Sequence, residues 1–204
     1  MNSVGRRRFP SVPSLEAHAL PFAKIVAATS YLPHPDTVKN LGGAVFPTAR
    51  ARKLHPRLST ISLAGETVGM YDDNATPAWA LFCSHGLEGT RPKGWTLSHV
   101  WPHCDDIRTY THLANLILIP EPLAALTDKQ GPLTGFLRWH AWQAYGWKPD
   151  KATLPSKPTG YDGVTWRYLE KIDDPRESVR RRLEAADNQR TRVLRPIMER
   201  LGMI

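Results

Sequence analysis

The sequence predicts a mixed α+β protein built around one main globular unit. Segments that alternate apolar and polar residues predict strands, and segments with apolar residues at helical spacing predict helices. The two kinds of segment are interleaved along the chain, which is typical of an α+β fold. The chain has 204 residues, 41% of them hydrophobic, so it can bury a sizeable core.

The N-terminal part of this unit is predicted to hold a helix, a hairpin and a second helix. Residues 34–43 read as a short helix that ends at Gly42-Gly43. Residues 59–74 are rich in β-branched side chains and place Gly65 at a turn, which predicts a β-hairpin. Residues 76–86 then read as a helix opened by Thr-Pro and closed by glycine.

The middle of the chain follows the order strand, polar loop, strand, helix. Residues 95–101 and 115–120 have strand length, and Pro120 ends the second strand. Residues 121–131 read as a short helix with Pro122 in its first turn. Residues 132–147 have apolar positions at helical spacing and predict a further helix.

These signals divide the chain into four predicted parts. They are a flexible basic arm at 1–15, a main domain at 16–150, a proline-rich linker at 151–174 and a basic C-terminal helix at 175–204. Pro196 is expected to kink or shorten that helix. Its apolar stripe offers a surface for pairing with a second copy.

The formal net charge of +8 favours a polyanionic partner. One basic cluster contains Arg50, Arg52, Lys53 and Arg57. A second lies in the C-terminal helix, where the candidate nucleic-acid-binding residues are Arg180, Arg181, Arg182, Arg190 and Arg192. The alternative for that helix is a solvated face joined by ion pairs between residues four apart. The sequence shows no membrane span or signal peptide, so we expect a cytoplasmic protein without membrane partners.

The run "LSHVWP", a polar loop, "ANLILIP" and the helix "EPLAALTDK" resemble the ββα-metal core of the HNH, or His-metal finger, nucleases. The resemblance covers about residues 94–130. It implies that His99 is a general base and that Asn115 orients it. A histidine with a pKa near its usual value of about 6.5 suits proton abstraction from water at neutral pH. The resemblance therefore predicts an HNH-like module flanked by an N-terminal helix and hairpin region and by C-terminal helices.

The metal ligands depart from the family pattern. Ser98 stands where most members have Asp or Glu, and Ala124 stands where they have a helix histidine. The candidate ligands that remain are Asp128, one turn after Ala124, and the loop residues Asp105, Asp106, His103 and His112. Such oxygen-rich ligands suit Mg²⁺ or Mn²⁺, and magnesium can keep several of its waters.

A structural zinc ion would need a different set of ligands. Cys83, His85, His103 and Cys104 make a Cys₂His₂ set in composition, but their spacing fits no zinc finger. We therefore do not expect a structural zinc site.

Together these features predict a metal-dependent, HNH-like endonuclease that hydrolyses phosphodiester bonds, with double-stranded DNA as the expected substrate. Arg108 is a candidate clamp for the scissile phosphate, and the C-terminal arginines would hold the nucleic-acid backbone. Ser98 and Ala124 favour the alternative, a protein that binds nucleic acid or a partner on a degenerate ββα scaffold without catalysis.

Overall fold

The computed structural model describes residues 15–50, 59–63, 66–71, 74–88, 91–102, 104–127 and 131–203. Its α-helices are α1 (Ala19–Thr29), α2 (Pro35–Leu41), α3 (Ala75–Ser84), α4 (Thr134–Tyr145), α5 (Pro175–Ala185) and α6 (Gln189–Arg200). Its strands are β1 (Thr48–Arg50), β2 (Ser59–Leu63), β3 (Glu66–Tyr71), β4 (Trp95–His99) and β5 (Leu116–Pro120). The 3₁₀ helices are η1 (Glu16–His18), η2 (Leu113–Asn115), η3 (Glu121–Thr127) and η4 (Tyr161–Gly163). The prediction of a mixed α+β protein is confirmed.

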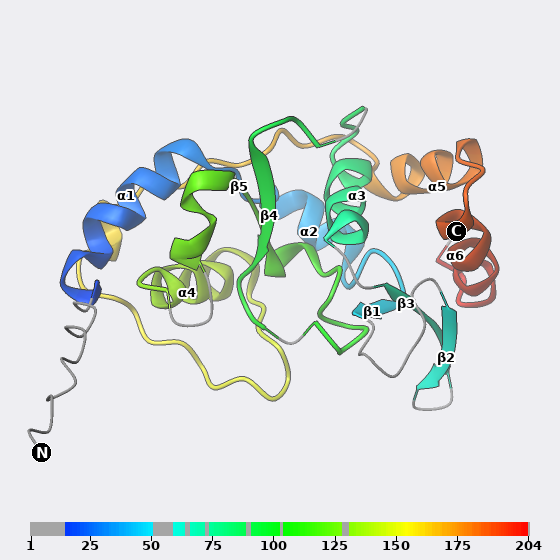
Figure 1. The fold of residues 1–204 in the computed structure, drawn as a ribbon, viewed down its shortest axis with the longest axis horizontal. Helices are drawn as coiled ribbons and strands as arrows, with labels where there is room; N and C mark the ends of the chain where they lie inside the picture. Colours follow the sequence, from blue (N-terminus) through cyan, green and yellow to red (C-terminus); the bar gives the residue numbers. More distant parts are fainter. Residues whose placement is uncertain are drawn as a thin grey trace, which may run out of the picture.

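The antiparallel pair of β4 and β5 lies in the middle of the molecule (Figure 1). Trp95 pairs with Pro120 and His99 with Leu116, so β4 ends where β5 begins. Both strands were predicted, and β5 is an unbroken apolar run because it is covered on both faces. Its outer edge receives a backbone bridge from Tyr31 to Leu118.

Successive residues of β5 point into two separate hydrophobic cores. Leu116 and Leu118 belong to a core with side chains from α3, α5 and α6. Ile117 and Ile119 belong to a second core with side chains from α1 and α4. Since strand side chains alternate between faces, one short strand serves both cores. Figure 1 shows this order, with α1 and α4 on one side of β4 and β5 and with α3, α5 and α6 on the other.

The second sheet has the strand order β1-β3-β2. The predicted hairpin is confirmed by the antiparallel pairing of β2 with β3. Its turn at Gly65 lies outside the described residues. β1 pairs with β3 in parallel and was not predicted, because three residues carry no strand periodicity.

The helix that follows β5 differs from the prediction. Residues Glu121–Thr127 form the 3₁₀ helix η3 and not an α-helix. A 3₁₀ helix has three residues per turn, so the α-helical spacing of four that related Ala124 to Asp128 does not apply within it. Asp128 itself lies outside the described residues.

Two segments of the chain differ in the structure from their predicted description. The expected linker at 151–174 contributes Tyr161, Val164 and Trp166 to the second core, because its aromatic and branched side chains are buried there. The expected single C-terminal helix is two helices that break at residues 186–188, although Pro196 lies inside α6 without ending it.

The C-terminal helices are packed against the rest of the chain. Val179 and Leu183 of α5 and Leu194 of α6 are buried in the first core. The apolar stripe predicted for this segment therefore contributes to the protein's own interior. Within the described part of the chain, no helix has the length and apolar character needed to cross a membrane.

Candidate functional site

His99 is the last residue of β4, and its ring is held by the loop that leads to β5. The Nε2 atom lies 3.0 Å from the carbonyl oxygen of Tyr110, and the ring stacks on that of Tyr110 at 5.7 Å between centroids. A carbonyl oxygen can only accept a hydrogen bond, so Nε2 carries the proton and donates it. This tautomer leaves the Nδ1 atom of His99 unprotonated, with a lone pair.

The surroundings of His99 favour its neutral form. Burial lowers the pKa of His99 to about 4; the hydrogen bond to Tyr110 opposes this shift, and the positive charge of Arg50 adds to it. At neutral pH the imidazole is therefore an uncharged proton acceptor.

Asn115 closes the polar loop between the two strands. Its side chain is fully buried; Oδ1 accepts a hydrogen bond from the Trp101 backbone N–H at 2.7 Å. Its Nδ2 donates to the carbonyl oxygens of Trp101 at 3.3 Å and Thr109 at 3.1 Å. The backbone oxygen of Asn115 also accepts from the N–H of Val100 at 2.9 Å. The amide thus joins the start of the loop to its end.

The structure brings His99 and Asn115 to the same end of the sheet, as the sequence predicted. The resemblance implies that Asn115 orients His99, but in the structure the carbonyl of Tyr110 contacts the imidazole. The amide of Asn115 instead fixes the loop backbone on which Tyr110 lies. Asn115 therefore acts on His99 through the loop.

Arg50 also lies near His99, although no sequence pattern indicated this. It ends β1, its backbone N–H donates to the carbonyl of Cys104 at 2.7 Å, and its guanidinium donates through Nη2 to Oδ1 of Asn74. Asn74 in turn donates from Nδ2 to the carbonyl of Leu97 in β4 at 3.2 Å. The sequence marked Arg50 only as one member of a basic cluster, because its approach to His99 depends on the packing of β1 beside the loop.

The predicted metal ligands are not assembled in the described residues. Asp106 accepts a hydrogen bond from the backbone N–H of Arg108 at 2.9 Å and thereby stabilises a turn, while Asp105 is exposed. Asp128 and His103 lie outside the residues that the structure describes. Among those it does describe, no group of three or more His, Cys, Asp or Glu side chains could hold a metal ion.

His85 and Cys83 have structural surroundings. The Nδ1 of His85 lies 2.8 Å from the carbonyl of Leu81, and its Nε2 accepts from the backbone N–H of His34 at 3.1 Å. Burial raises the pKa of the Cys83 thiol to about 12, so it is protonated at neutral pH. Both ring nitrogens of His85 are thus in contact with backbone groups, and the Cys83 sulfur carries its proton.

The predicted phosphate-binding arginines are largely engaged within the protein. Arg108 pairs with Asp150 at 2.8 Å. Intramolecular partners also hold four of the C-terminal arginines: Arg180 with Glu177 and Glu184, Arg181 with Glu177, Arg182 with the carbonyl of Leu87, and Arg192 with Asp187. Arg190 is half-buried in the first turn of α6. Much of the C-terminal segment thus matches the alternative of a solvated helix face joined by ion pairs.

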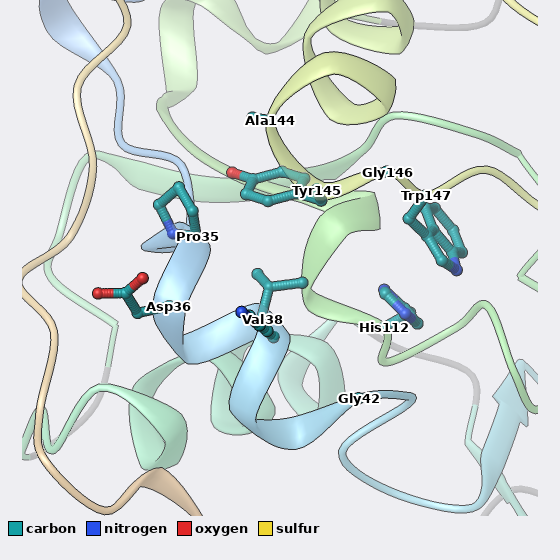
Figure 2. Close-up of a pocket in the computed structure, with 10 residues that line it drawn as sticks. Pro35, Asp36, Val38, Gly42, His112, Ala144, Tyr145, Gly146 and Trp147 are labelled. Carbon is teal, nitrogen blue, oxygen red and sulfur yellow. The ribbon is translucent and has the colours of Figure 1, made fainter.

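His112 lines a pocket of about 290 Å³ between α2 and the end of α4 (Figure 2). Its ring stacks on that of Trp147 at 4.1 Å, and its Nδ1 accepts from the backbone N–H of Ala114 at 3.2 Å. In Figure 2 the carboxylate of Asp36 points away from His112, and it pairs with Lys171 at 3.0 Å. The pocket therefore lacks the convergent oxygen ligands that a magnesium ion needs.

Comparison of the chain with protein-family models, with curated proteins and with solved structures found no match.

Proposed function

We propose that this protein is an HNH-like phosphodiester hydrolase that cuts DNA, with His99 as its general base. The observation that carries the proposal is the imidazole at the end of β4, which is neutral, fixed in one tautomer by the carbonyl of Tyr110, and left with its lone pair on Nδ1. The order of β4, loop and β5 and the amide clamp of Asn115 support the resemblance to the ββα-metal nucleases.

The chemistry follows from the atoms of the imidazole. Nδ1 takes a proton from a water molecule as the water oxygen attacks phosphorus, and the bond from phosphorus to the leaving oxygen breaks. The product imidazolium keeps its Nε2–H bond to the Tyr110 carbonyl, which stabilises the positive charge. An anionic phosphate beside His99 would raise the pKa of His99 from about 4 towards neutrality and so make it a stronger base.

Dependence on Mg²⁺ or Mn²⁺ remains part of the proposal as an expectation from the resemblance. The carboxylates of the described residues do not form a set that fits such an ion, so no step is assigned to it here. We expect cleavage to require added Mg²⁺ or Mn²⁺ and to stop with EDTA. Cleavage that persists in EDTA would contradict the metal requirement.

Plasmid cleavage tests the role of His99. We expect His99→Gln to cut at least about 10²-fold more slowly than the parent, because a positioned base contributes about that factor or more. Gln keeps an N–H donor for the Tyr110 carbonyl, so it is a matched control for folding, while His18→Ala removes an exposed histidine and should leave the rate unchanged.

The alternative function predicts a different outcome of the same assay. A non-catalytic binding protein would bind DNA with a steep salt dependence and cut no plasmid with any metal. That result, obtained with folded protein, would exclude the hydrolase.

The pH dependence of cleavage gives a second test of His99. Because its pKa is lowered to about 4, the fraction of neutral imidazole in the free enzyme stays constant from pH 8 to about pH 5.5. We expect kcat/KM to show no fall at pH 6.5 in that range, with circular dichroism confirming that the protein is folded. A midpoint near pH 6.5 would contradict the environment assigned to His99.

A further inference from the structure

We propose that Arg50, positioned by Asn74, forms a phosphate-binding site beside His99. The anion site is argued from its own contacts, and only its use in cleavage rests on the proposed function. Arg50 would touch the substrate, and Asn74 would act through Arg50.

Arg50 differs in its contacts from the arginines that form ion pairs. Arg108, Arg180 and Arg192 each form an ion pair with a carboxylate. No carboxylate of the described residues pairs with Arg50, whose guanidinium donates to the neutral amide of Asn74. Its positive charge therefore has no acidic partner in the part of the chain that the structure describes.

The guanidinium of Arg50 also has an unused donor inside the protein. Its Nε atom is buried and has no hydrogen-bond acceptor among the residues that the structure describes. A buried donor without a partner destabilises the protein, and more so when the group is charged. An anion that accepts from this edge of the guanidinium would recover that loss.

Asn74 ties the guanidinium to the strand that bears His99. Its Oδ1 accepts from Nη2 of Arg50, and its Nδ2 donates to the carbonyl of Leu97, two residues before His99. The charge of Arg50 lies close enough to His99 to lower the pKa of that histidine. Asn74 thus connects the guanidinium of Arg50 to β4, the strand that carries His99.

This arrangement indicates the class of ligand. The planar fork of a guanidinium matches the non-bridging oxygens of a phosphate through two parallel hydrogen bonds. A phosphodiester bound there would place its phosphorus beside the imidazole, and the negative charge that develops in hydrolysis would be offset by Arg50.

Binding of inorganic phosphate to the full chain tests the site without any cleavage. In a calorimetric titration we expect Arg50→Gln to weaken phosphate binding at least 10-fold. Gln retains an N–H donor for Asn74, and Arg50→Lys, which retains the charge without the fork, should fall between the two. The matched control is Lys157→Ala, which removes an exposed cation paired with Asp162 and should leave phosphate binding within twofold of the parent.

The outcomes separate this inference from the proposed function. Phosphate binding that Arg50→Gln leaves unchanged, or that Lys157→Ala weakens as strongly, would overturn the site at Arg50. Phosphate binding that depends on Arg50 in a protein that cuts no DNA would support the anion site and reject the hydrolase. In an active enzyme, Asn74→Ala should lower the affinity for phosphate and should raise KM more than it lowers kcat. If Asn74→Ala has the parental affinity and kinetics, the positioning role of Asn74 is rejected.

Discussion

At the scale of single residues, backbone groups of the loop between β4 and β5 hold both His99 and Asn115. His99 and Asn115 were predicted because of their places at the ends of two strands. The hydrogen bond from His99 to Tyr110 is made to a backbone carbonyl, so no residue type in the sequence announces it. Likewise, Arg50 joins the site only through the folding of β1 against residues far along the chain.

Asn115 is expected to be essential for stability as well as for the site. Asn115→Ala would leave the Trp101 N–H and the Trp101 carbonyl oxygen inside the protein without these partners and would remove one of two donors to the Thr109 carbonyl, at a cost of about 3 kcal/mol. Urea unfolding measures this difference. The control Asn40→Ala removes an exposed side chain and should change the free energy of unfolding by less than about 0.5 kcal/mol. Equal effects of the two substitutions would contradict the clamp.

At the scale of elements, the prediction succeeded where periodicity is strong and failed where it is short or broken. The segments of β4, β5, α3 and α4 all carry enough residues to reveal their type. The three-residue strand β1 does not, and the difference between the 3₁₀ helix η3 and an α-helix cannot be read from seven residues. Pro196 was expected to kink or shorten the C-terminal helix. It lies inside α6 without ending it, and the helical conformation is interrupted earlier, at residues 186–188.

The break between α5 and α6 is stabilised by a capping box. The side chain of Asn188 accepts from the N–H of Thr191, whose hydroxyl accepts from the N–H of Asn188. We expect Asn188→Ala to lower the free energy of unfolding by about 1 kcal/mol, since it removes the N-cap acceptor. Gln189→Ala, at the neighbouring exposed position, serves as the control in the same thermal melts and should lie near the parent. A melting temperature of Asn188→Ala equal to that of Gln189→Ala would argue against the cap.

At the scale of the whole molecule, the division into domain, linker and tail was less accurate than the individual elements. Proline-rich composition indicated a linker at 151–174, yet the aromatic residues within it are buried. The apolar stripe of the tail suggested a surface for pairing with a second copy, yet Leu183 and Leu194 of that stripe are buried in the first core. Composition describes a segment in isolation, whereas burial depends on the partners that the fold supplies.

Buried neutral histidines make the whole molecule sensitive to acid. Burial is the main cause that lowers the pKa of His85, His112 and His140 to about 4. Between pH 6.5 and 4 the unfolded chain binds protons that the native protein does not, so stability falls as pH falls, by about 1.4 kcal/mol per pH unit for each histidine.

Thermal unfolding measured from pH 8 to pH 4 checks this expectation. The melting temperature should be nearly constant above pH 7 and should decline steadily below pH 6.5. A melting temperature that stays constant down to pH 5 would show that these histidines are accessible to protons in the native state.

The backbone bridges around β5 set the order in which this chain can be completed during synthesis. Tyr31 exchanges hydrogen bonds with Leu118, and Leu32 does so with Arg167 and Leu169, so segments separated by 87 to 137 residues lie side by side. A nascent chain that has reached residue 150 on the ribosome still lacks the segment that closes the edge at Leu32. The strand that carries His99 and the 3₁₀ helix that carries Asn115 are therefore translated before the segment that closes this edge, and the edge is complete only after residue 169 has been translated.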